Sequence, residues 1–273
     1  LPDLDNADSG SVKMDLPQHI FRAYDIRGNA ESDLRNDVVE QLGRAIGSFA
    51  LSSGQRQLVV GRDGRLSAER IHQQLIDGVL ATGCDVIDLG LVATPMLYFA
   101  AEFLETQAGV MVTGSHSEPD INGLKIMLNG QALADGQILA LAERIKSEQF
   151  EQGEGTLTEY DIADAYIDQI AEDVVVASPI KVVLDCCNGA ASEMAPMLFA
   201  ALGCEVVPLF CEVDGHFPNH CPDPGKPGNL QSLIDEVKKQ NADLGLAFDG
   251  DADRLVAVTG DGRIVAPDLL LML

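Results

Sequence analysis

Three aspartates at alternate positions form the most specific chemical pattern in this sequence. Asp249, Asp251 and Asp253 lie in DGDADR, between two apolar segments, and Arg254 closes the motif. Carboxylates in this arrangement can converge on one hard cation that prefers oxygen ligands. A calcium-binding EF-hand loop opens with the same alternation, but it needs Gly where Arg254 stands, Glu where Gly260 stands, and helical flanks. A solvated acidic turn remains the alternative for the motif taken alone.

A serine follows an apolar segment in TGSHSEPDINGLKI, residues 113–126. Gly114 allows a tight turn, which leaves Ser115 at the carboxyl end of the expected strand, where open α/β sheets bind ligands. His116 is adjacent and Lys125 follows a second glycine turn. A serine hydroxyl is a weak nucleophile and needs a base or electrostatic help. The G-x-S-x-G motif of hydrolases is absent because Thr113 occupies its first position, and a turn-forming hydroxyl is the simpler interpretation.

Basic residues concentrate in turn motifs of an acidic chain. Only 18 residues are Lys or Arg, and six of them are Arg22, Arg27, Arg62, Arg65, Lys125 and Arg254. Such a concentration favours a phosphate-binding field. For Arg65 alone, pairing with the aspartate of its own turn has comparable weight. Neither a P-loop nor a dinucleotide-binding glycine motif occurs, so a nucleotide cofactor has no support.

A loop rich in proline and glycine, DGHFPNHCPDPGKPGNL, carries His216, His220 and Cys221. A zinc site would need a second cysteine at the usual spacing, so a shaped loop is the preferred interpretation. The six cysteines form no C-x-x-C pair, and buried reduced thiols of a cytosolic protein explain them most simply.

Composition limits the classes of function. The 273 residues are 46% hydrophobic, enough for a substantial core, and carry a formal net charge of −25. Such charge repels nucleic acids and anionic membranes, so neither is expected as a partner. The polar, acidic N-terminus does not resemble a secretory signal, and no apolar run is long enough to span a membrane. We expect a soluble, cytoplasmic protein.

The elements that must position these residues alternate between helix and strand. Helical spacing is expected over 34–53, 67–82, 95–105, 135–149, 161–174, 191–202 and 230–240. Short apolar strands are expected over 57–61, 85–89, 109–113, 124–127, 181–185, 205–209, 244–248 and 255–259, after an extended segment that turns at Gly28. The alternation predicts an α/β fold of two related three-layer α/β/α domains with mainly parallel mixed sheets.

The chain divides into four expected parts. Residues 1–15 read as a disordered acidic tail, 16–155 as a first domain with the serine loop, and 156–264 as a second domain with the aspartate loop. The polar segment 151–160 suggests the boundary. Residues 265–273 begin a helix that has no stop signal, so they are expected to start a truncated third domain of a longer protein.

Taken together, the motifs resemble the α-D-phosphohexomutase superfamily, and most of all its bacterial phosphomannomutase/phosphoglucomutase group. FRAYDIRG, GRDGR, TGSH with D-x-NG-x-KI, DG-x-FPNH-x-PDP and DGDADR occur in the family's order after the tail. The resemblance implies a mutase that interconverts hexose 1- and 6-phosphates of mannose or glucose. Its phosphoserine passes a phosphoryl group through a bisphosphorylated sugar, with glucose or mannose 1,6-bisphosphate as activator.

The resemblance also implies roles for individual residues. Ser115 would carry the phosphate and would hold Mg²⁺ together with Asp249, Asp251 and Asp253. Arg27, Lys125 and His116 would be the other catalytic residues, and Arg22, Tyr24, Arg62 and Arg254 would contact substrate phosphate.

Two departures from the family pattern qualify the resemblance. Ser117-Glu118 stands where the family usually has Asn-Pro, and the motifs of a third and a fourth domain are absent. The missing C-terminal domains are therefore expected partners of this chain, and the chain alone is expected to turn over sugar poorly. Phosphoglucosamine mutase, a non-catalytic sugar-phosphate-binding module and a metal-dependent phosphatase remain as alternative functions.

Overall fold

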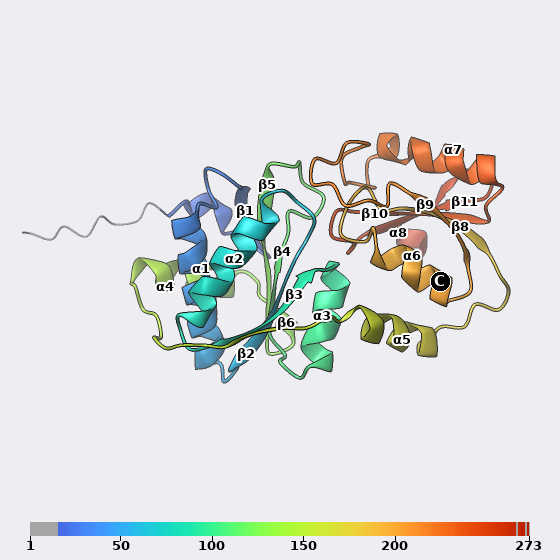
Figure 1. Ribbon diagram of the computed structural model, residues 1–273. Helices are drawn as coiled ribbons and strands as arrows, with labels where there is room; N and C mark the ends of the chain where they lie inside the picture. The colour runs from blue at the N-terminus through green and yellow to red at the C-terminus, as the bar shows by residue number, and fades with distance from the viewer. Residues whose placement is uncertain (1–15, 266, 271, 273) are drawn as a thin grey trace, which may run out of the picture.

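The computed structural model describes residues 16–265, 267–270 and 272, in which helices and strands alternate in two α/β units (Figure 1). The expected tail, residues 1–15, lies outside the described residues. The strands of the first unit are β1 (Ile26–Asn29), β2 (Gln57–Arg62), β3 (Asp85–Leu91), β4 (Gly109–Val112), β5 (Ile121–Leu128), β6 (Gln131–Ala132) and β7 (Leu157–Glu159). They form one sheet in the order β1-β5-β4-β2-β3-β7, with β6 paired to β5.

Helices cover both faces of this sheet (Figure 1). On one face lie α1 (Asn36–Ser52), α2 (Ala68–Leu80) and α4 (Gly136–Lys146), and on the other lies α3 (Thr94–Phe103). Two glycines let α1 and α2 approach closely, because a Cβ on Gly43 would lie 2.3 Å from the carbonyl oxygen of Leu75, and one on Gly78 would lie 2.2 Å from that of Glu40. The apolar spacing of α1 and α2 supplies much of the core on this face.

The second unit has the same layered plan. Its strands are β8 (Lys181–Asp185), β9 (Glu205–Leu209), β10 (Leu244–Phe248), β11 (Leu255–Thr259) and β12 (Ile264–Val265), in the order β12-β11-β10-β8-β9. Helix α7 (Gln231–Gln240) packs on one face and α6 (Met194–Ala201) on the other. Alternate residues of β8 serve the two cores, because Val183 packs beneath α7 while Val182 packs beneath α6.

The segment between the two units is tied to the first. Strand β7, which falls in the part that the sequence assigned to the second domain, pairs in parallel with β3. Helix α5 (Ala163–Asp173) follows it, and the ring of Tyr166 lies 5.4 Å from that of Phe99 on α3. Short 3-10 helices, η1 (Gln18–Ile20) and η2 (Pro227–Leu230), and the C-terminal α8 (Pro267–Leu270) complete the described elements.

The α/β class, the mixed sheets and the expected helices and strands are confirmed in the described residues. Among the named strands, parallel pairing is found in β4-β2-β3-β7 and in β10-β8-β9. Antiparallel pairing joins β1, β4 and β6 to β5, and joins β10 and β12 to β11. Strands β10 and β11 are antiparallel because the 249–254 turn between them is too short for the crossover that a parallel neighbour requires. No described helix is both long and apolar enough to cross a membrane.

Candidate active site

The site forms where strands of both units end. In the first unit β2 leads into Asp63 and β4 leads into Ser115, and in the second unit β10 leads directly into Asp249. Loops at the carboxyl ends of parallel strands are the usual ligand sites of open α/β sheets. Here two such edges face each other, so the serine loop and the aspartate loop meet across the boundary between the units.

Ser115 is held in a strained and buried position. Its φ of +50° lies in the left-handed region, which non-glycine residues adopt at an energetic cost, and its side chain is buried. Its backbone N–H donates to Oγ1 of Thr113 at 2.8 Å. Its hydroxyl donates to Oδ2 of Asp249 at 2.9 Å and lies 3.3 Å from Nδ1 of His116. The hydroxyl therefore faces two groups that can accept a proton.

The three aspartates of DGDADR converge as the sequence predicted. One carboxylate oxygen from each of Asp249, Asp251 and Asp253 lies within 4.8 Å of the others. Lys125 joins the cluster from β5, with Nζ 2.6 Å from Oδ2 of Asp251 and in contact with Oδ2 of Asp253. The positive charge of Lys125 offsets part of the repulsion among the carboxylates, so the cluster can exist in the metal-free chain.

Asp251 leaves one buried oxygen for a further ligand. Its Oδ2 accepts a hydrogen bond of 2.5 Å from Thr94 Oγ1, and its carbonyl oxygen accepts one of 2.9 Å from the Thr94 backbone N–H. Its Oδ1 is buried and has no hydrogen-bond partner among the described residues. A buried carboxylate oxygen without a partner costs free energy unless an ion or a donor meets it. The donor set fits a hard divalent cation such as Mg²⁺.

Burial and the two neighbouring carboxylates, Asp251 and Asp253, raise the pKa of Asp249 to about 8. Burial also opposes the charge on Asp251, but the ammonium of Lys125 and its hydrogen bond hold the pKa of Asp251 below its usual value. The two carboxylates thus have pKa values shifted in opposite directions. Asp249 is the one that keeps a proton near neutral pH in the metal-free chain.

The raised pKa of Asp249 predicts how stability depends on pH. Between pH 5 and its folded pKa of about 8, the folded chain binds a proton that the unfolded chain has lost, so this group makes stability fall as pH rises. We expect Asp249→Asn to remove that component. Urea unfolding with a metal chelator at pH 5, 6, 7 and 8 measures this component as the difference in unfolding free energy between the unmodified chain and Asp249→Asn. An equal difference at all four pH values would contradict the assignment.

A buried arginine shapes the serine loop. Arg65 donates to four carbonyl oxygens of the loop, those of Ser115 at 2.7 Å, Ser117 at 2.8 Å, Glu118 at 2.6 Å and Ile121 at 2.9 Å. Its Nε donates to Oδ2 of Asp63 at 3.2 Å. A Cβ on Gly114 would lie 2.6 Å from the guanidinium carbon, so the glycine is needed for this approach. Sequence analysis left two roles for Arg65, phosphate binding and pairing within its own turn. The contacts support a structural role, because its donors face the Asp63 carboxylate and the protein backbone.

The second unit supports the same arginine. The ring of Phe217 lies beneath the guanidinium of Arg65, 5.1 Å from its central carbon to the ring centroid, which is a cation–π arrangement. A Cβ on Gly215 would lie 2.5 Å from the backbone nitrogen of Leu66 and 2.7 Å from the carbonyl oxygen of Gly64. The DG-x-FPNH loop therefore packs closely on the GRDGR turn and fixes the two units around the site.

Three further predicted residues, Arg27, His116 and Arg254, lie around Ser115. Arg27 is buried and donates to Gly114 O at 3.3 Å, to Ser117 Oγ at 3.0 Å and to Asp25 Oδ2 at 2.5 Å. Burial, with the charges of Arg254 and Arg27, lowers the pKa of His116. A neutral imidazole beside the Ser115 hydroxyl can accept a proton.

Three other candidates are not joined to this cluster. Arg22 and Tyr24 are exposed, and neither side chain makes a hydrogen bond or an ion pair within the described part of the chain. Arg62 donates to the carbonyl oxygen of Asp63 at 3.4 Å, and its charge acts on Asp88. Their roles as phosphate contacts therefore stay a prediction.

The histidines of the DG-x-FPNH loop do not form a zinc site. His216 is exposed and pairs with Asp214 at 2.9 Å. His220 is turned inward, with Nε2 3.1 Å from Asp185 Oδ2 at the end of β8. Among the described residues, the group able to hold a metal is the aspartate cluster.

The unusual Glu118 projects away from the hydroxyl of Ser115. Its side chain is largely exposed, and Oε1 lies 3.9 Å from Nζ of Lys226 and 3.7 Å from Sγ of Cys221, both in the second unit. The backbone of Glu118, in contrast, is one of the acceptors of Arg65. The side chain of Glu118 thus adds an exposed contact between the two units.

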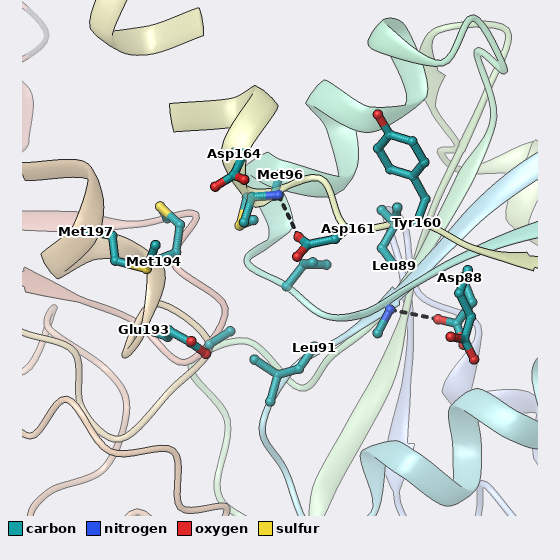
Figure 2. Close-up of a pocket in the computed structure, with 15 residues that line it drawn as sticks. Asp88, Leu89, Leu91, Met96, Tyr160, Asp161, Asp164, Glu193, Met194 and Met197 are labelled. Atoms are coloured by element: carbon teal, nitrogen blue, oxygen red, sulfur yellow. Dashed lines mark hydrogen bonds between the residues drawn. The ribbon is translucent and has the colours of Figure 1, made fainter. Parts of the chain in front are cut away.

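A hollow of about 560 Å³ between β3, α5 and α6 is lined by none of the three aspartates of the cluster (Figure 2). Its charged lining residues are Asp88, Glu159, Asp161, Asp164 and Glu193. Asp88 accepts a hydrogen bond from the Gly90 backbone at 2.7 Å, and Asp161 accepts one from that of Ala163 at 3.0 Å. Because the lining residues include no cationic side chain, the hollow repels anions and is unsuited to phosphate.

Sequence reasoning missed three residues that complete the site. Thr94 begins α3 and anchors Asp251, Asp63 accepts hydrogen bonds from Thr113 Oγ1 and Arg65, and Phe217 supports Arg65 from below. Thr94 and Asp63 could have been found from their positions, because Asp63 directly follows β2 and Thr94 lies just after β3. Phe217 carried no such signal.

Comparison with known proteins agrees with this geometry. The family model described as "Phosphoglucomutase/phosphomannomutase, alpha/beta/alpha domain I" matches residues 18–152, and the model of domain II matches residues 164–262. The phosphomannomutase/phosphoglucomutase of Pseudomonas aeruginosa is 55% identical over 258 residues, which cover 94% of this chain and 56% of that protein. The phosphoglucomutase of Neisseria gonorrhoeae is 46% identical, with 94% and 56% covered.

A solved structure gives the same result. The phosphoglucomutase/phosphomannomutase family protein of Burkholderia thailandensis superposes with a TM-score of 0.91 at 46% identity, and the match covers 94% of this chain and 58% of that one. The chain spans about half the length of the curated relatives it matches. The two family models together account for most of the described residues, and the serine and aspartate loops meet as the resemblance implied. The chain belongs to the phosphoglucomutase/phosphomannomutase family.

Proposed function

We propose that this chain carries the phosphoryl-transfer half of a hexose-phosphate mutase, with Ser115 as the phosphate carrier. The observation that supports this most strongly is the hydrogen bond of 2.9 Å from the Ser115 hydroxyl to Asp249, inside the aspartate cluster. A turn-forming serine would direct its hydroxyl to a nearby backbone carbonyl. Ser115 instead directs it into a cluster that can hold a cation, across the boundary between the two units.

In the proposed step the Ser115 oxygen attacks the phosphorus of a hexose bisphosphate. A bond forms between Oγ and phosphorus, the bond from phosphorus to the sugar oxygen breaks, and the serine proton ends on that sugar oxygen. Asp249 Oδ2 and His116 Nδ1 are the acceptors within reach of the proton. In the opposite direction, phosphorylated Ser115 gives its phosphoryl group to the free hydroxyl of a hexose monophosphate and forms the bisphosphate. The bisphosphate then reorients and returns its other phosphate to Ser115, which completes the interconversion of 1- and 6-phosphates.

Asp249, Asp251 and Asp253, with an oxygen of phosphorylated Ser115, would hold Mg²⁺. Bound there, the ion would neutralise charge on the transferring phosphoryl group. Lys125 sits on the same carboxylates and would remain as a second positive charge beside the phosphate. Arg27, His116 and Arg254 surround the serine, and Arg22, Tyr24 and Arg62 would engage the ligand from the rim.

The remaining half of the relatives' length would supply the sugar-reading and distal phosphate-binding groups. Hexose phosphates, and glucose or mannose 1,6-bisphosphate as activator, are the proposed ligands. Residues 265–273 would begin the first of these additional domains. We expect this chain alone to accept phosphate on Ser115 but to interconvert hexose phosphates slowly, because binding energy from remote groups drives such reactions.

Intact-mass measurement before and after incubation with Mg²⁺ and glucose 1,6-bisphosphate tests the proposal. The expected result is one added phosphate that maps to Ser115. Release of inorganic phosphate from hexose phosphates would favour the phosphatase alternative, and binding without covalent phosphate would favour a binding module. Assays with glucose, mannose and glucosamine phosphates, on a chain extended to the relatives' full length, distinguish the mutase classes.

The metal site makes a separate prediction. We expect Mg²⁺ to bind the folded chain and not the unfolded chain, and so to raise the melting temperature. The stabilisation should be about 2.7 kcal/mol when the Mg²⁺ concentration is 100 times its dissociation constant. Asp251→Asn should remove this shift, because it neutralises a carboxylate of the cluster. Asp261→Asn, at an exposed aspartate in another turn, is the matched control and should keep the shift. A shift that survives in Asp251→Asn would place the cation elsewhere.

A further inference from the structure

Two thiols meet at the adjacent ends of β8 and β9. Cys186 directly follows β8 and Cys211 lies two residues beyond β9, and these strands are parallel neighbours (Figure 1). Their sulfur atoms are 3.2 Å apart. The backbone N–H of Cys186 donates to the carbonyl oxygen of Leu209 at 3.1 Å, so the two strand ends are already joined. An S–S bond is about 2.05 Å long, so closing this pair requires roughly 1 Å of sulfur movement.

The two sulfurs differ in access to solvent. Cys186 is fully buried, whereas Cys211 is half-buried and lines a hollow of about 380 Å³ with Asn188, Phe210 and Asn219. A small oxidant can therefore reach Cys211 first. The neighbouring Cys186 thiol, which can donate a hydrogen bond, holds the pKa of Cys211 below its usual value and so favours its thiolate. An accessible thiolate beside a buried second thiol is the arrangement of redox-active cysteine pairs.

We propose that Cys186 and Cys211 are a modification site that a peroxide converts to an intramolecular disulfide. In the first step the Cys211 thiolate attacks a peroxide oxygen, the O–O bond breaks, and a sulfenic acid and hydroxide form. In the second step the Cys186 sulfur attacks the sulfenic sulfur, an S–S bond forms, and water leaves with the proton of the Cys186 thiol. Two electrons pass from the two sulfurs to one peroxide, and a dithiol reductant reverses the change.

The other cysteines of the described chain lack this arrangement. Cys84 is buried in the first unit, and burial raises its pKa to about 12. Burial also raises the pKa of Cys187, which follows Cys186 but forms no hydrogen bond with another sulfur among the described residues, and of the partly buried Cys204. Cys221 faces Glu118, and its burial and that carboxylate raise its pKa. Peroxide should therefore act on one pair.

The test treats the intact chain with hydrogen peroxide and counts free thiols with a maleimide under denaturing conditions. We expect the loss of two of six thiols, a mass lower by two hydrogen atoms, and recovery after reduction. Cleavage after glutamate separates residues 173–193 from 206–212, and these two peptides should be joined before reduction. Cys211→Ser and Cys186→Ala should each abolish the link, and Cys204→Ser, the matched control, should retain it.

The two cysteine variants guard against different artefacts. If the buried Cys186→Ala fails to fold, Cys211→Ser at the half-buried position still tests the link. A cross-link that survives in Cys186→Ala would assign the bond to Cys187 and overturn the proposal. So would over-oxidation of Cys211 by two oxygen atoms with all other thiols free, or a disulfide between two chains.

Discussion

Ser115→Ala is expected to abolish phosphate incorporation from glucose 1,6-bisphosphate, lowering its rate by on the order of 10³-fold or more, because the atom that accepts the phosphoryl group is removed. The fold should survive, since alanine keeps the Cβ and the backbone bonds of the loop. The Arg65 donors reach carbonyl oxygens, which the substitution leaves in place. Intact mass and a phosphorylation time course measure the effect, and the melting temperature checks the fold.

The control for this variant is an exposed serine outside the site. Ser147→Ala, after α4, removes a hydroxyl that donates to the carbonyl oxygen of Glu143 at 2.8 Å, far along the first unit from the aspartate cluster. It should incorporate phosphate at the rate of the unmodified chain. Phosphate that appears equally on the Ser115→Ala protein would end the claim that this serine is the carrier. Phosphate that maps to Ser117 in both proteins would move the carrier by two residues.

Arg65→Met is expected to lower the free energy of unfolding by about 3–5 kcal/mol, the usual cost of removing one partner of a buried ion pair. Methionine has similar length but no donors. Asp63 would lose its buried cation, and the carbonyl oxygens of the serine loop would lose their shared donor. Phosphorylation of Ser115 should fall as well, because the strained loop loses the group that holds it. Urea unfolding and the phosphorylation assay measure both effects.

Arg62→Met in the same turn separates this role from general loss of charge. Within the described residues Arg62 makes a single hydrogen bond, of 3.4 Å to the Asp63 carbonyl oxygen, so the change in unfolding free energy should stay below about 1 kcal/mol. Equal losses of stability in the two variants would show that Arg65 does not organise the loop. A large loss of stability in Arg65→Met with phosphorylation unchanged would show that the loop keeps its shape without it.

Much of the fold and of the reacting cluster could be predicted from the sequence. Apolar periodicity indicated the helices and strands, and the resemblance to the phosphohexomutases implied that Ser115 and the three aspartates would meet. Strand β7 could not be predicted, because Leu157, Thr158 and Glu159 are all exposed and show no alternation of burial. Such a strand is specified by its partner β3, and a single segment does not reveal its partner.

The network around Arg65 could not be predicted for a related reason. The sequence shows an aspartate two positions away, which explains one bond, but the four carbonyl oxygens come from a loop about fifty residues later. Their convergence depends on the left-handed turn at Ser115 and on the packing of Phe217 beneath. Thr94 is similar, since its bond to Asp251 spans 157 positions and joins two units. Long-range polar contacts of this kind can be recognised only when the relative position of the two sheet edges is known.

The pairing of β7 with β3 and the contact of Tyr166 with Phe99 bear on where genes of this family can be recombined. A chimera joined at residues 151–156 would give the first sheet a foreign edge strand on β3 and would set a foreign Tyr166 against Phe99. A crossover at residues 174–180 keeps both contacts with their native partners. That segment lies between α5 and β8, outside helices and strands, and is mostly exposed. Shuffled libraries cut there should yield more folded progeny than libraries cut at the polar stretch near residue 155.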